Sequence, residues 1–562
     1  MSEGKSQGMK WVVLLWLVAA ALVREPAPLV RTRSGLVRGV LSHDRRSYQY
    51  FGIPYGRVDR SNRFQAPLPP PTWEGVFDAM EEHIRCPQAM GPIIMGDPDC
   101  LRVNVYTPTR VHDEPLPVMV FIHGGSFFEG TGTGYLYGAD EFPEHGVVFV
   151  GVNYRLNVEG FLCLGIKEAP GNAGLKDQIA ALRWVKENIR AFGGDPNNVM
   201  LFGESAGAVS TSYLVLSQAA KGLFHKAILQ SGSSLAPWGM QRDPIKTASN
   251  LAKEFGHDTK DPQEIHSILS NKSVEELISA IKYSERKNYI TAETLFVPCI
   301  EKVIPGVEPV VTRHPTDIIR HGNYTKVPMI IGFNDNEGLY FVSADYGINV
   351  KEVNPVQNLQ NDLEFPSDRD KNETVERIKE EYFSAKKDLV TGLVELYSDL
   401  HFKIPTVLES SLYAQTTDQP IYYYLFKYNG YINVPKLISM FWFKPGASHA
   451  DELFYLFKPH SFPMPWRRLE RNMIQRMLTL WTNFAKYSDP TPRTSRLLPL
   501  RWRPSRQSNP TALVLDHKLG STRLWDHANV ALWNDTYARY RRRHYGFRRT
   551  TRAKYSISLG QR

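Results

Sequence analysis

The fold is decided by the stretch Val199-Met200-Leu201-Phe202-Gly203-Glu204-Ser205-Ala206-Gly207. Its first four residues predict a short buried strand, and a run compatible with a helix begins at Ala208. The G-x-S-x-G motif between them is typical of a sharp strand-to-helix turn that exposes the serine hydroxyl, with glycines where a Cβ would strike the crossing backbone. A plain glycine-rich turn is the alternative, because this pentapeptide is common by chance. The flanking strand and helix favour Ser205 as a nucleophile.

Outward from this motif, apolar and β-branched runs alternate with segments of helical periodicity. The clearest helix runs from about Ala173 to Phe192, because its apolar residues recur every three or four positions. Asn172 is expected to cap its start, and Gly193-Gly194 to end it. The alternation predicts an α/β protein with a large, mostly parallel central sheet covered by helices, and with helical insertions at about 240–320 and 345–415. The expected strands are Leu101–Tyr106, Val118–Ile122, Val147–Val152, Val199–Phe202, Lys226–Leu229, Val327–Ile331 and Ile421–Phe426.

A second motif, His123-Gly124-Gly125-Ser126, follows directly on one of these strands. Its two glycines let the backbone N–H groups of Gly124 and Gly125 point at one spot, where the N–H of Ala206 joins them. Donors placed in this way stabilise the oxyanion that forms when a hydroxyl attacks a carbonyl carbon. We therefore expect these three N–H groups to form an oxyanion hole.

Beyond these two motifs, the chain resembles the carboxylesterase/cholinesterase family of α/β-hydrolases, and most closely the insect carboxylesterases. The similarity runs from about Val37 to Trp533. It implies the α/β-hydrolase fold, with helical insertions over an active-site gorge, and a serine esterase that works through an acyl-enzyme. The motifs that carry the resemblance are Phe51-Gly52-Ile53-Pro54-Tyr55, Asp99-Cys100-Leu101, Asn153-Tyr154-Arg155, Gly171-Asn172, Gly193-Gly194-Asp195-Pro196, Gln230-Ser231-Gly232 and Trp481-Thr482-Asn483-Phe484.

The resemblance also assigns an acid and a base, which follow the serine in the order acid, then histidine. The acid motif is Gly332-Phe333-Asn334-Asp335-Asn336-Glu337-Gly338, in which the resemblance points to Glu337. The residues alone leave Asp335 open as a rival. His449 matches the family's histidine motif, although Ala450 stands where many members have Gly. With an ordinary imidazole, activity would fall in acid with an apparent pKa near about 6.5.

Four further residues are candidates for the substrate pocket. By resemblance, Phe127, Phe128 and Phe296 form walls of the gorge and the acyl pocket, which would suit an apolar, uncharged substrate. Core packing is an equally good interpretation of each phenylalanine. Glu204 stands directly before the nucleophile, where juvenile hormone esterases usually carry Gln, and this disfavours juvenile hormone as the substrate.

The two ends of the chain differ from its body. Residues 1–25 contain the apolar run Trp11–Val23, which is too short to span a bilayer and is typical of a secretory signal peptide. Residues 26–538 are expected to form a single domain. Residues 539–562 contain nine basic and no acidic residues, which equals the net charge of +9 of the whole chain. We expect this tail to be disordered and to bind anionic surfaces weakly at most, with no transmembrane anchor and no nucleic-acid partner.

Cysteines and glycosylation motifs agree with an extracellular location. Cys86 and Cys100 would close a short loop of about 15 residues, so we expect a disulfide between them. Cys163 and Cys299 lie in apolar contexts and are expected to be buried thiols, although four cysteines permit three pairings. Acceptor motifs for N-glycans begin at Asn271, Asn323, Asn372 and Asn534.

Together these features predict a secreted serine carboxylesterase for small to medium apolar esters, such as odorants, pheromones or xenobiotic esters. A non-catalytic, cholinesterase-like adhesion protein is the alternative, but such proteins typically lose a catalytic residue, and this chain retains all three. A dinucleotide enzyme is disfavoured, because Gly130-Thr131-Gly132-Thr133-Gly134 lacks the G-x-G-x-x-G spacing. No group of residues has the spacing of a zinc site, so we expect no metal ion and no cofactor.

Overall fold

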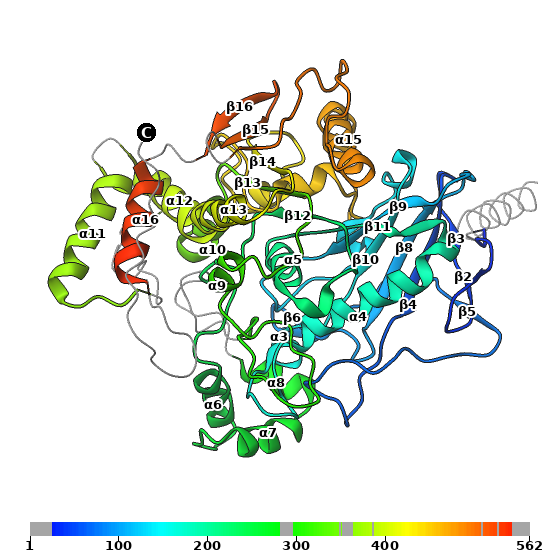
Figure 1. Ribbon diagram of the computed structural model, residues 1–562, viewed down its shortest axis with the longest axis horizontal. Coiled ribbons are helices and arrows are strands. Elements are labelled where there is room, and N and C mark those ends of the chain that lie inside the picture. Colours follow the sequence, from blue (N-terminus) through cyan, green and yellow to red (C-terminus); the bar gives the residue numbers. More distant parts are fainter. Residues whose placement is uncertain are drawn as a thin grey trace, which may run out of the picture.

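The computed structural model describes residues 25–281, 296–347, 350, 363–384, 387–506, 510–524 and 528–541 (Figure 1). Apart from Glu25, the expected signal peptide lies outside the described residues, as does the expected tail beyond Arg541. None of the described helices has the length and apolar composition that a membrane span requires. In the same ranges, no cluster of His, Cys, Asp and Glu is arranged to hold a metal ion.

A large mixed sheet forms the centre of the molecule. In the described residues it has 11 strands, in the order β16 (Gly520–Arg523), β15 (Thr511–Leu515), β14 (Ile421–Phe426), β13 (Met329–Asn334), β12 (Lys226–Gln230), β11 (Gly194–Glu204), β9 (Leu116–Ile122), β10 (Val148–Val152), β8 (Arg102–Pro108), β4 (Ser47–Pro54) and β3 (Val40–Leu41). Two smaller sheets contain β1 (Val30–Arg31), β2 (Leu36–Arg38) and β5 (Val76–Asp78), and β6 (Gln88–Met90) and β7 (Ile93–Met95).

The direction of the strands matches the expected architecture. Neighbours from β15 across to β10 are parallel, and the pairs at both edges are antiparallel. Each of the seven predicted strands is present, and β14 has the predicted bounds, whereas β11 begins five residues before the predicted Val199. The sheet and the helices that cover it confirm the predicted α/β-hydrolase fold.

Both faces of the sheet are covered, because alternate side chains of the central strands enter different cores. Val118, Val120 and Ile122 pack into one core with residues of α4 (Ala173–Asn188) and α5 (Ala206–Leu216). Met119 and Phe121, on the other face, pack with α15 (Arg471–Tyr487). This two-sided burial explains why the strands read as nearly continuous apolar runs.

The predicted long helix is present and Asn172 is its N-cap residue as expected, but the side chain of Asn172 does not cap it. α4 continues into a 3-10 turn, Ile189–Phe192, which ends at Gly193 in the left-handed conformation. Asn172 makes no capping hydrogen bond. Its side chain instead donates to the carbonyl of Cys299 (2.9 Å) and accepts from the N–H of Cys299 (2.8 Å). A contact with a segment 127 residues away therefore overrides the local capping preference of Asn172.

The disulfides agree with the sequence at one site and correct it at the other. Cys86 and Cys100 are bonded as expected. The expectation of two buried thiols is wrong, because Cys163 and Cys299 form a second disulfide across 136 residues. Gly171 lies directly against both sulfur atoms, so the absence of a Cβ there lets the two segments meet. In the chain-entropy model a loop of this length contributes about 4–5 kcal/mol to stability.

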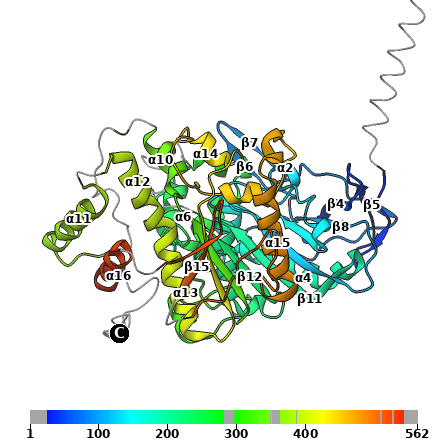
Figure 2. The same ribbon diagram turned by 90° about the horizontal axis from the view of Figure 1, so that it is seen from above.

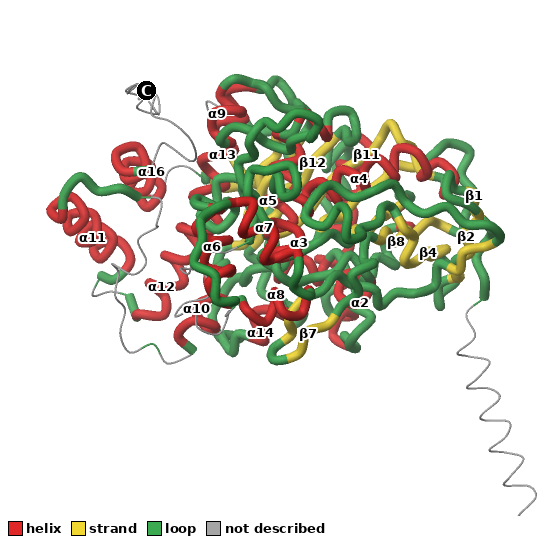
Figure 3. The backbone as a smooth tube through the Cα atoms, turned by 90° about the horizontal axis from the view of Figure 1, so that it is seen from below, coloured by secondary structure: helices red, strands yellow, loops and turns green. Residues whose placement is uncertain are grey.

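The two ends of the molecule are built from different parts of the chain. α11 (Asp368–Tyr382) and α16 (Ala528–Tyr540) lie together at one end, and the N-terminal strands lie at the other (Figures 2 and 3). α10 (Gly338–Tyr346) directly follows the acid motif and packs against α12 (Leu389–Ser398) and α14 (Val434–Ile438). The remaining helices are α2 (Gly134–Tyr137), α3 (Asn157–Phe161), α6 (Pro244–Glu254), α7 (Pro262–Ser270), α8 (Val274–Ala280), α9 (Pro315–Arg320) and α13 (Ile404–Thr416).

Candidate active site

The turn between β11 and α5 presents Ser205. This residue has φ 56° and ψ −124°, a strained conformation of the kind that is found at functional sites and costs about 1–3 kcal/mol. A Cβ on Gly203 would lie 2.4 Å from the backbone of Gly207, and one on Gly207 would lie 2.0 Å from the carbonyl oxygen of Ile122. Only glycine fits at both positions, so the motif forms the sharp turn that its sequence predicts.

The loop after β9 lies against this turn. A Cβ on Gly124 would lie 3.0 Å from the Cβ of Ser205, which places the two backbones side by side. Gly125 has φ 104°, and a Cβ there would lie 2.1 Å from the carbonyl oxygen of Glu129. The N–H groups of Gly124 and Gly125 have no acceptor within the described residues. Ala206 begins α5, where N–H groups have no intrahelical acceptor.

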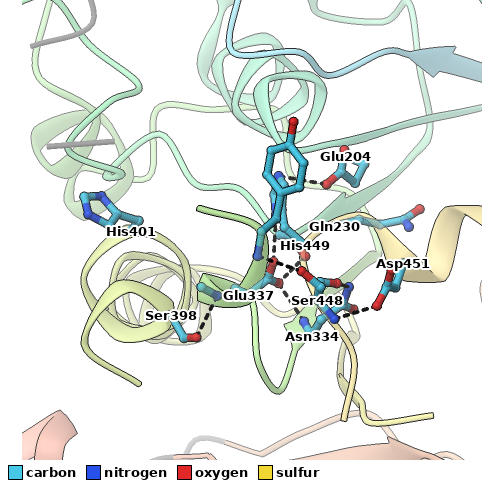
Figure 4. A network of polar contacts seen from close by, with 12 residues as sticks. Glu204, Gln230, Asn334, Glu337, Ser398, His401, Ser448, His449 and Asp451 are labelled. Atoms are coloured by element: carbon cyan, nitrogen blue, oxygen red, sulfur yellow. Dashed lines mark hydrogen bonds and ion pairs between the residues drawn. The ribbon is translucent and has the colours of Figure 1, made fainter. Parts of the chain in front are cut away.

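An imidazole and a carboxylate meet next to this turn, as Figure 4 shows. His449 Nδ1 is 2.6 Å from Glu337 Oε2, and Glu337 is fully buried. The other oxygen of Glu337 accepts from the hydroxyl of Ser231 (2.5 Å) and from the N–H of Asn334 (2.7 Å). Because both oxygens of Glu337 are hydrogen-bonded, the carboxylate fixes the orientation of the imidazole.

Asp335, the rival left open by the sequence, supports the histidine loop instead. Its Oδ1 accepts from the N–H of Ala447 at 2.7 Å, whereas the contact with the imidazole belongs to Glu337. Ala450 has φ 64°, a left-handed conformation that glycine adopts without strain. The conformation explains why glycine suits this position, and Ala450 adopts it at the cost of some strain.

Glu204 lies on the opposite side of the imidazole from Glu337. Its Oε1 is 3.1 Å from His449 Nε2 (Figure 4). Burial alone would lower the pKa of His449, but Glu204 and Glu337 outweigh it and raise this pKa to about 9. Burial also raises the pKa of Glu204 well above its ordinary value. The raised pKa of His449 differs from the ordinary imidazole value near 6.5 that the sequence suggested.

Nε2 is close to Glu204 without a directional bond. Oε1 of Glu204 makes no hydrogen bond within the described residues, so its 3.1 Å contact with Nε2 lacks hydrogen-bond geometry. The hydroxyl of Ser205 likewise has no hydrogen bond to a described residue. In enzymes without substrate the hydrogen bonds of catalytic groups are often long, and they shorten when the substrate binds. The backbone N–H of Ser205 donates to the carbonyl of Gln230 at 2.9 Å, which fixes the turn.

Two aromatic side chains that the sequence did not single out pack against the imidazole. The ring of Phe402 lies 4.5 Å from that of His449, and the ring of Phe341 lies 5.1 Å away. Phe341 lies on α10, four residues after Glu337. This helical spacing could have predicted that its ring lies on the same side as Glu337. Phe402 lies in a π-helical turn, Asp399–Lys403, for which the sequence has no comparable signal.

The expected pocket residues differ in exposure. Phe127 is fully buried in the core, with its ring edge-on to Phe161 at 5.0 Å. Phe296 is also buried in this core, and Phe128 is half-buried. Core packing therefore accounts for Phe127 and Phe296 as well as the expected role as pocket walls does.

A buried polar network behind the site was also missed by the sequence analysis. Glu452 accepts from the side-chain amides of Gln230 (3.1 Å) and Asn334 (2.6 Å). Burial raises the pKa of Glu452 to about 7. Trp481 donates its indole N–H to Gln230 at 2.9 Å. Gln230 and Trp481 belong to motifs that carry the family resemblance. Their hydrogen bonds in this network give these two residues a structural role.

The expected N-glycan acceptors lie outside the site. Asn271, Asn323 and Asn372 are exposed. Asn534 is half-buried on α16. The first three are therefore accessible to a modifying enzyme in the folded chain, whereas Asn534 is less so.

The fold and the site together define an α/β-hydrolase with a serine in the sharp turn between β11 and α5. A model of the carboxylesterase family matches residues 26–533, and the chain belongs to this family. It is a carboxylic ester hydrolase.

Named relatives include an insect esterase and a vertebrate lipase. The chain is 32% identical to Esterase FE4 of Myzus persicae, over 85% of this chain and 88% of that one. It is 34% identical to the bile salt-activated lipase of Homo sapiens, over 92% of this chain and 70% of that one. The crystal structure of juvenile hormone esterase from Manduca sexta, with OTFP covalently attached, superposes with a TM-score of 0.79 at 30% identity, covering 91% of this chain and 99% of that one.

Proposed function

We propose that this enzyme hydrolyses esters through an acyl-enzyme on Ser205. The observation that carries the proposal is the 2.6 Å contact of His449 Nδ1 with Glu337, because it leaves Nε2 facing Glu204, the residue directly before Ser205, at 3.1 Å. His449 accepts the proton of the hydroxyl as Ser205 attacks the carbonyl carbon, and Glu337 stabilises the resulting imidazolium. The alcohol leaves with that proton. Water then attacks the acyl-enzyme by the same route and releases the acid.

The charge that develops on the carbonyl oxygen needs donors in the same place. The N–H groups of Gly124, Gly125 and Ala206 are proposed for this role, because the glycine loop and the serine turn are in direct contact. Each such donor typically contributes about 3–4 kcal/mol to stabilisation of the transition state. Gly125 adopts φ 104°, which is accessible to glycine without strain, and this lets the loop take the required shape.

The proposed substrates are small to medium esters without charge. Phe341 and Phe402 line the imidazole with apolar rings, and Phe128 and Phe296 are proposed to extend this surface. Glu204 is proposed to border the same pocket. Because its carboxyl group is buried, a negative charge on the substrate would lie next to it with little screening by water, which disfavours anionic substrates. Odorants, pheromones and xenobiotic esters belong to this class. Secretion after removal of residues 1–25, with N-glycans on exposed asparagines, is proposed as the setting.

A hydrolysis assay tests this function directly. Release of p-nitrophenol is measured from p-nitrophenyl esters of increasing acyl length, and acid release is measured from volatile acetates. Ser205→Ala should lower kcat/KM by about 10⁴-fold or more. Juvenile hormone and a long-chain triglyceride serve as further substrates, because relatives are named for activity on such molecules.

Ser210→Ala is the matched control, since Ser210 lies one turn further along α5 and bonds only to Gln178 among the described residues. This variant should retain activity. If Ser205→Ala and Ser210→Ala hydrolyse p-nitrophenyl esters equally well, Ser205 is not the nucleophile. If only a charged ester is hydrolysed, the proposed substrate class is wrong while the proposed chemistry stands.

A further inference from the structure

Large apolar side chains are exposed on the segment that contains α14. Trp442 is 65% exposed and Phe443 61% exposed, and Tyr431, Ile438 and Met440 are exposed to a similar degree. A soluble monomer rarely shows so many large apolar side chains together, and a patch of this kind indicates an interaction site. These five residues define what we call the aromatic patch.

A second segment extends the aromatic patch. The N–H of Tyr431 donates to Glu470 at 2.7 Å, which brings the two segments together. Trp466 and Leu469, on this second segment, are also well exposed. The hydroxyl of Tyr428 donates to the other oxygen of Glu470 at 2.6 Å. The carboxylate of Glu470 is therefore buried and hydrogen-bonded, and it adds no exposed negative charge to the surface.

The aromatic patch is a fixed part of the fold. Phe441 is buried between the exposed Met440 and Trp442, and the ring of Phe443 stands edge-on to it at 6.1 Å. Met440 has φ 62°, a conformation that is unfavourable for a side chain other than glycine. At this turn the side chain of Phe441 is buried, whereas those of Met440 and Trp442 are exposed. A strained turn that exposes apolar side chains suggests that their exposure has a use.

The patch is also tied to the loop that carries the imidazole. Asp451 accepts from the N–H of Lys436 on α14 at 3.1 Å and from the N–H of Ser448 at 2.6 Å. Ser448 directly precedes His449. α14 and α10 also pack together on one edge of the molecule (Figure 2). A surface that binds the patch would therefore lie beside the elements that form the site.

The charges around the patch favour an anionic partner. Residues 431–445 contain no acidic residue, and the only one in residues 461–471 is the buried Glu470. Arg468 and Arg471 are exposed and have no carboxylate partner within the described residues. Lys444 is paired with Asp388 at 3.3 Å and contributes little free charge. Exposed Trp, Tyr and Phe beside basic side chains are typical of surfaces that enter the headgroup region of a lipid layer.

We propose that the aromatic patch binds the surface of an anionic lipid layer. Trp442, Phe443 and Ile438 enter the headgroup region, and Arg468 and Arg471 contact the phosphates. Bound in this way, the enzyme would take up apolar molecules that partition into lipid. The binding itself does not require the proposed esterase mechanism.

Co-sedimentation of the full chain with vesicles tests the proposal. Wild type should bind vesicles of phosphatidylcholine that contain phosphatidylglycerol, and tryptophan emission should shift to the blue. Trp442→Ser/Phe443→Ser should weaken binding about tenfold or more. Arg468→Gln and Arg471→Gln should each weaken it about fivefold, and only when phosphatidylglycerol is present.

The matched control is Leu29→Ser/Tyr487→Ser, which removes exposed apolar side chains elsewhere. Tyr487 ends α15, about 25 Å along the helix from its start beside the patch. This control should bind like wild type, and circular dichroism should show that both double variants are folded. Equal binding of wild type and Trp442→Ser/Phe443→Ser would overturn the proposal, and so would a lack of binding by wild type. Self-association in sedimentation velocity that this double variant abolishes would assign the patch to a second copy of the chain instead.

Discussion

Two histidines in this molecule lie between pairs of carboxylates, and their surroundings differ. His449 lies between Glu337 at 2.6 Å and Glu204 at 3.1 Å. His460 lies between Glu82 at 2.6 Å and Asp140 at 2.7 Å. The carboxylates outweigh burial in both cases and raise the pKa of each imidazole to about 9.

The second ring nitrogen separates the two sites. Nε2 of His460 is hydrogen-bonded to Asp140, so both of its nitrogens are occupied. Nε2 of His449 has a close contact with Glu204 that is not a hydrogen bond. His449 is also 9% exposed and surrounded by aromatic rings, whereas His460 is 26% exposed. A raised imidazole pKa therefore does not identify a catalytic base. The proposed base is distinguished by a ring nitrogen without a hydrogen bond to a described residue, close to the residue that precedes Ser205.

The largest expected difference between the two histidines is in activity. His449→Gln should lower kcat/KM for a p-nitrophenyl ester by about 10⁴-fold, because it removes the proton acceptor for Ser205. His460→Gln should change kcat/KM less than about threefold, because His460 only joins two carboxylates. Similar losses of kcat/KM in both variants would show that the free Nε2 of His449 does not distinguish it from His460.

The next largest effect concerns the pH dependence of activity. His449 must be neutral to accept a proton, so kcat/KM falls as the pH drops below its pKa. Glu204→Gln removes one of the charges that raise this pKa and should move the midpoint of the acid limb down by roughly one unit. The profile of kcat/KM is measured from pH 5 to about 10. Asp140→Asn, next to His460, is the control and should leave the midpoint in place.

A smaller effect is expected on stability at the second histidine. The pKa of His460 is raised on folding, so its contribution to stability is complete below the unfolded pKa near 6.5 and is lost as the pH rises through about 9. Because the side chain is 26% exposed, solvent screening limits this contribution to roughly 1–2 kcal/mol. His460→Gln should lower Tm at pH 6 and have little effect near pH 10. An equal loss of Tm at both pH values would mean that charge is not its source.

The smallest expected effect is at Ala450, which directly follows His449. Its φ of 64° strains an alanine, so Ala450→Gly should relieve that strain. The greater freedom of glycine in the unfolded chain offsets part of the gain, which leaves a stabilisation of about 0.5–1 kcal/mol. Urea denaturation measures this difference. Ala447→Gly, in the same loop with no positive φ, should instead be destabilising.

Much of the fold could be read from the sequence, because the central strands are buried on both faces and therefore appear as apolar runs. The turn at Ser205 was also predictable, since its motif carries the glycines that a tight turn close to a neighbouring strand requires. Glu337 was assigned by resemblance. Its choice over Asp335 depends on which carboxylate reaches an imidazole more than 100 residues later, and that contact has no local signature.

Features that depend on distant contacts were not predictable in the same way. Three contacts join segments that only the folded chain brings together. They are the Cys163–Cys299 disulfide, the hydrogen bonds of Asn172 to Cys299, and the packing of the Phe402 ring against His449. The raised pKa of His449 has the same origin, because it depends on two carboxylates from distant segments, Glu204 at the end of β11 and Glu337 at the start of α10.

The most direct test of the central claim is covalent labelling by an organophosphate, followed by mass spectrometry of peptides. The account predicts one phosphoryl group per chain, on the peptide that contains Ser205, and no label on Ser205→Ala. It also predicts that His449→Gln is labelled far more slowly than wild type, whereas His460→Gln is labelled at the wild-type rate. A label on another residue, or equal labelling rates in wild type and His449→Gln, would contradict the assignment of the nucleophile and its base.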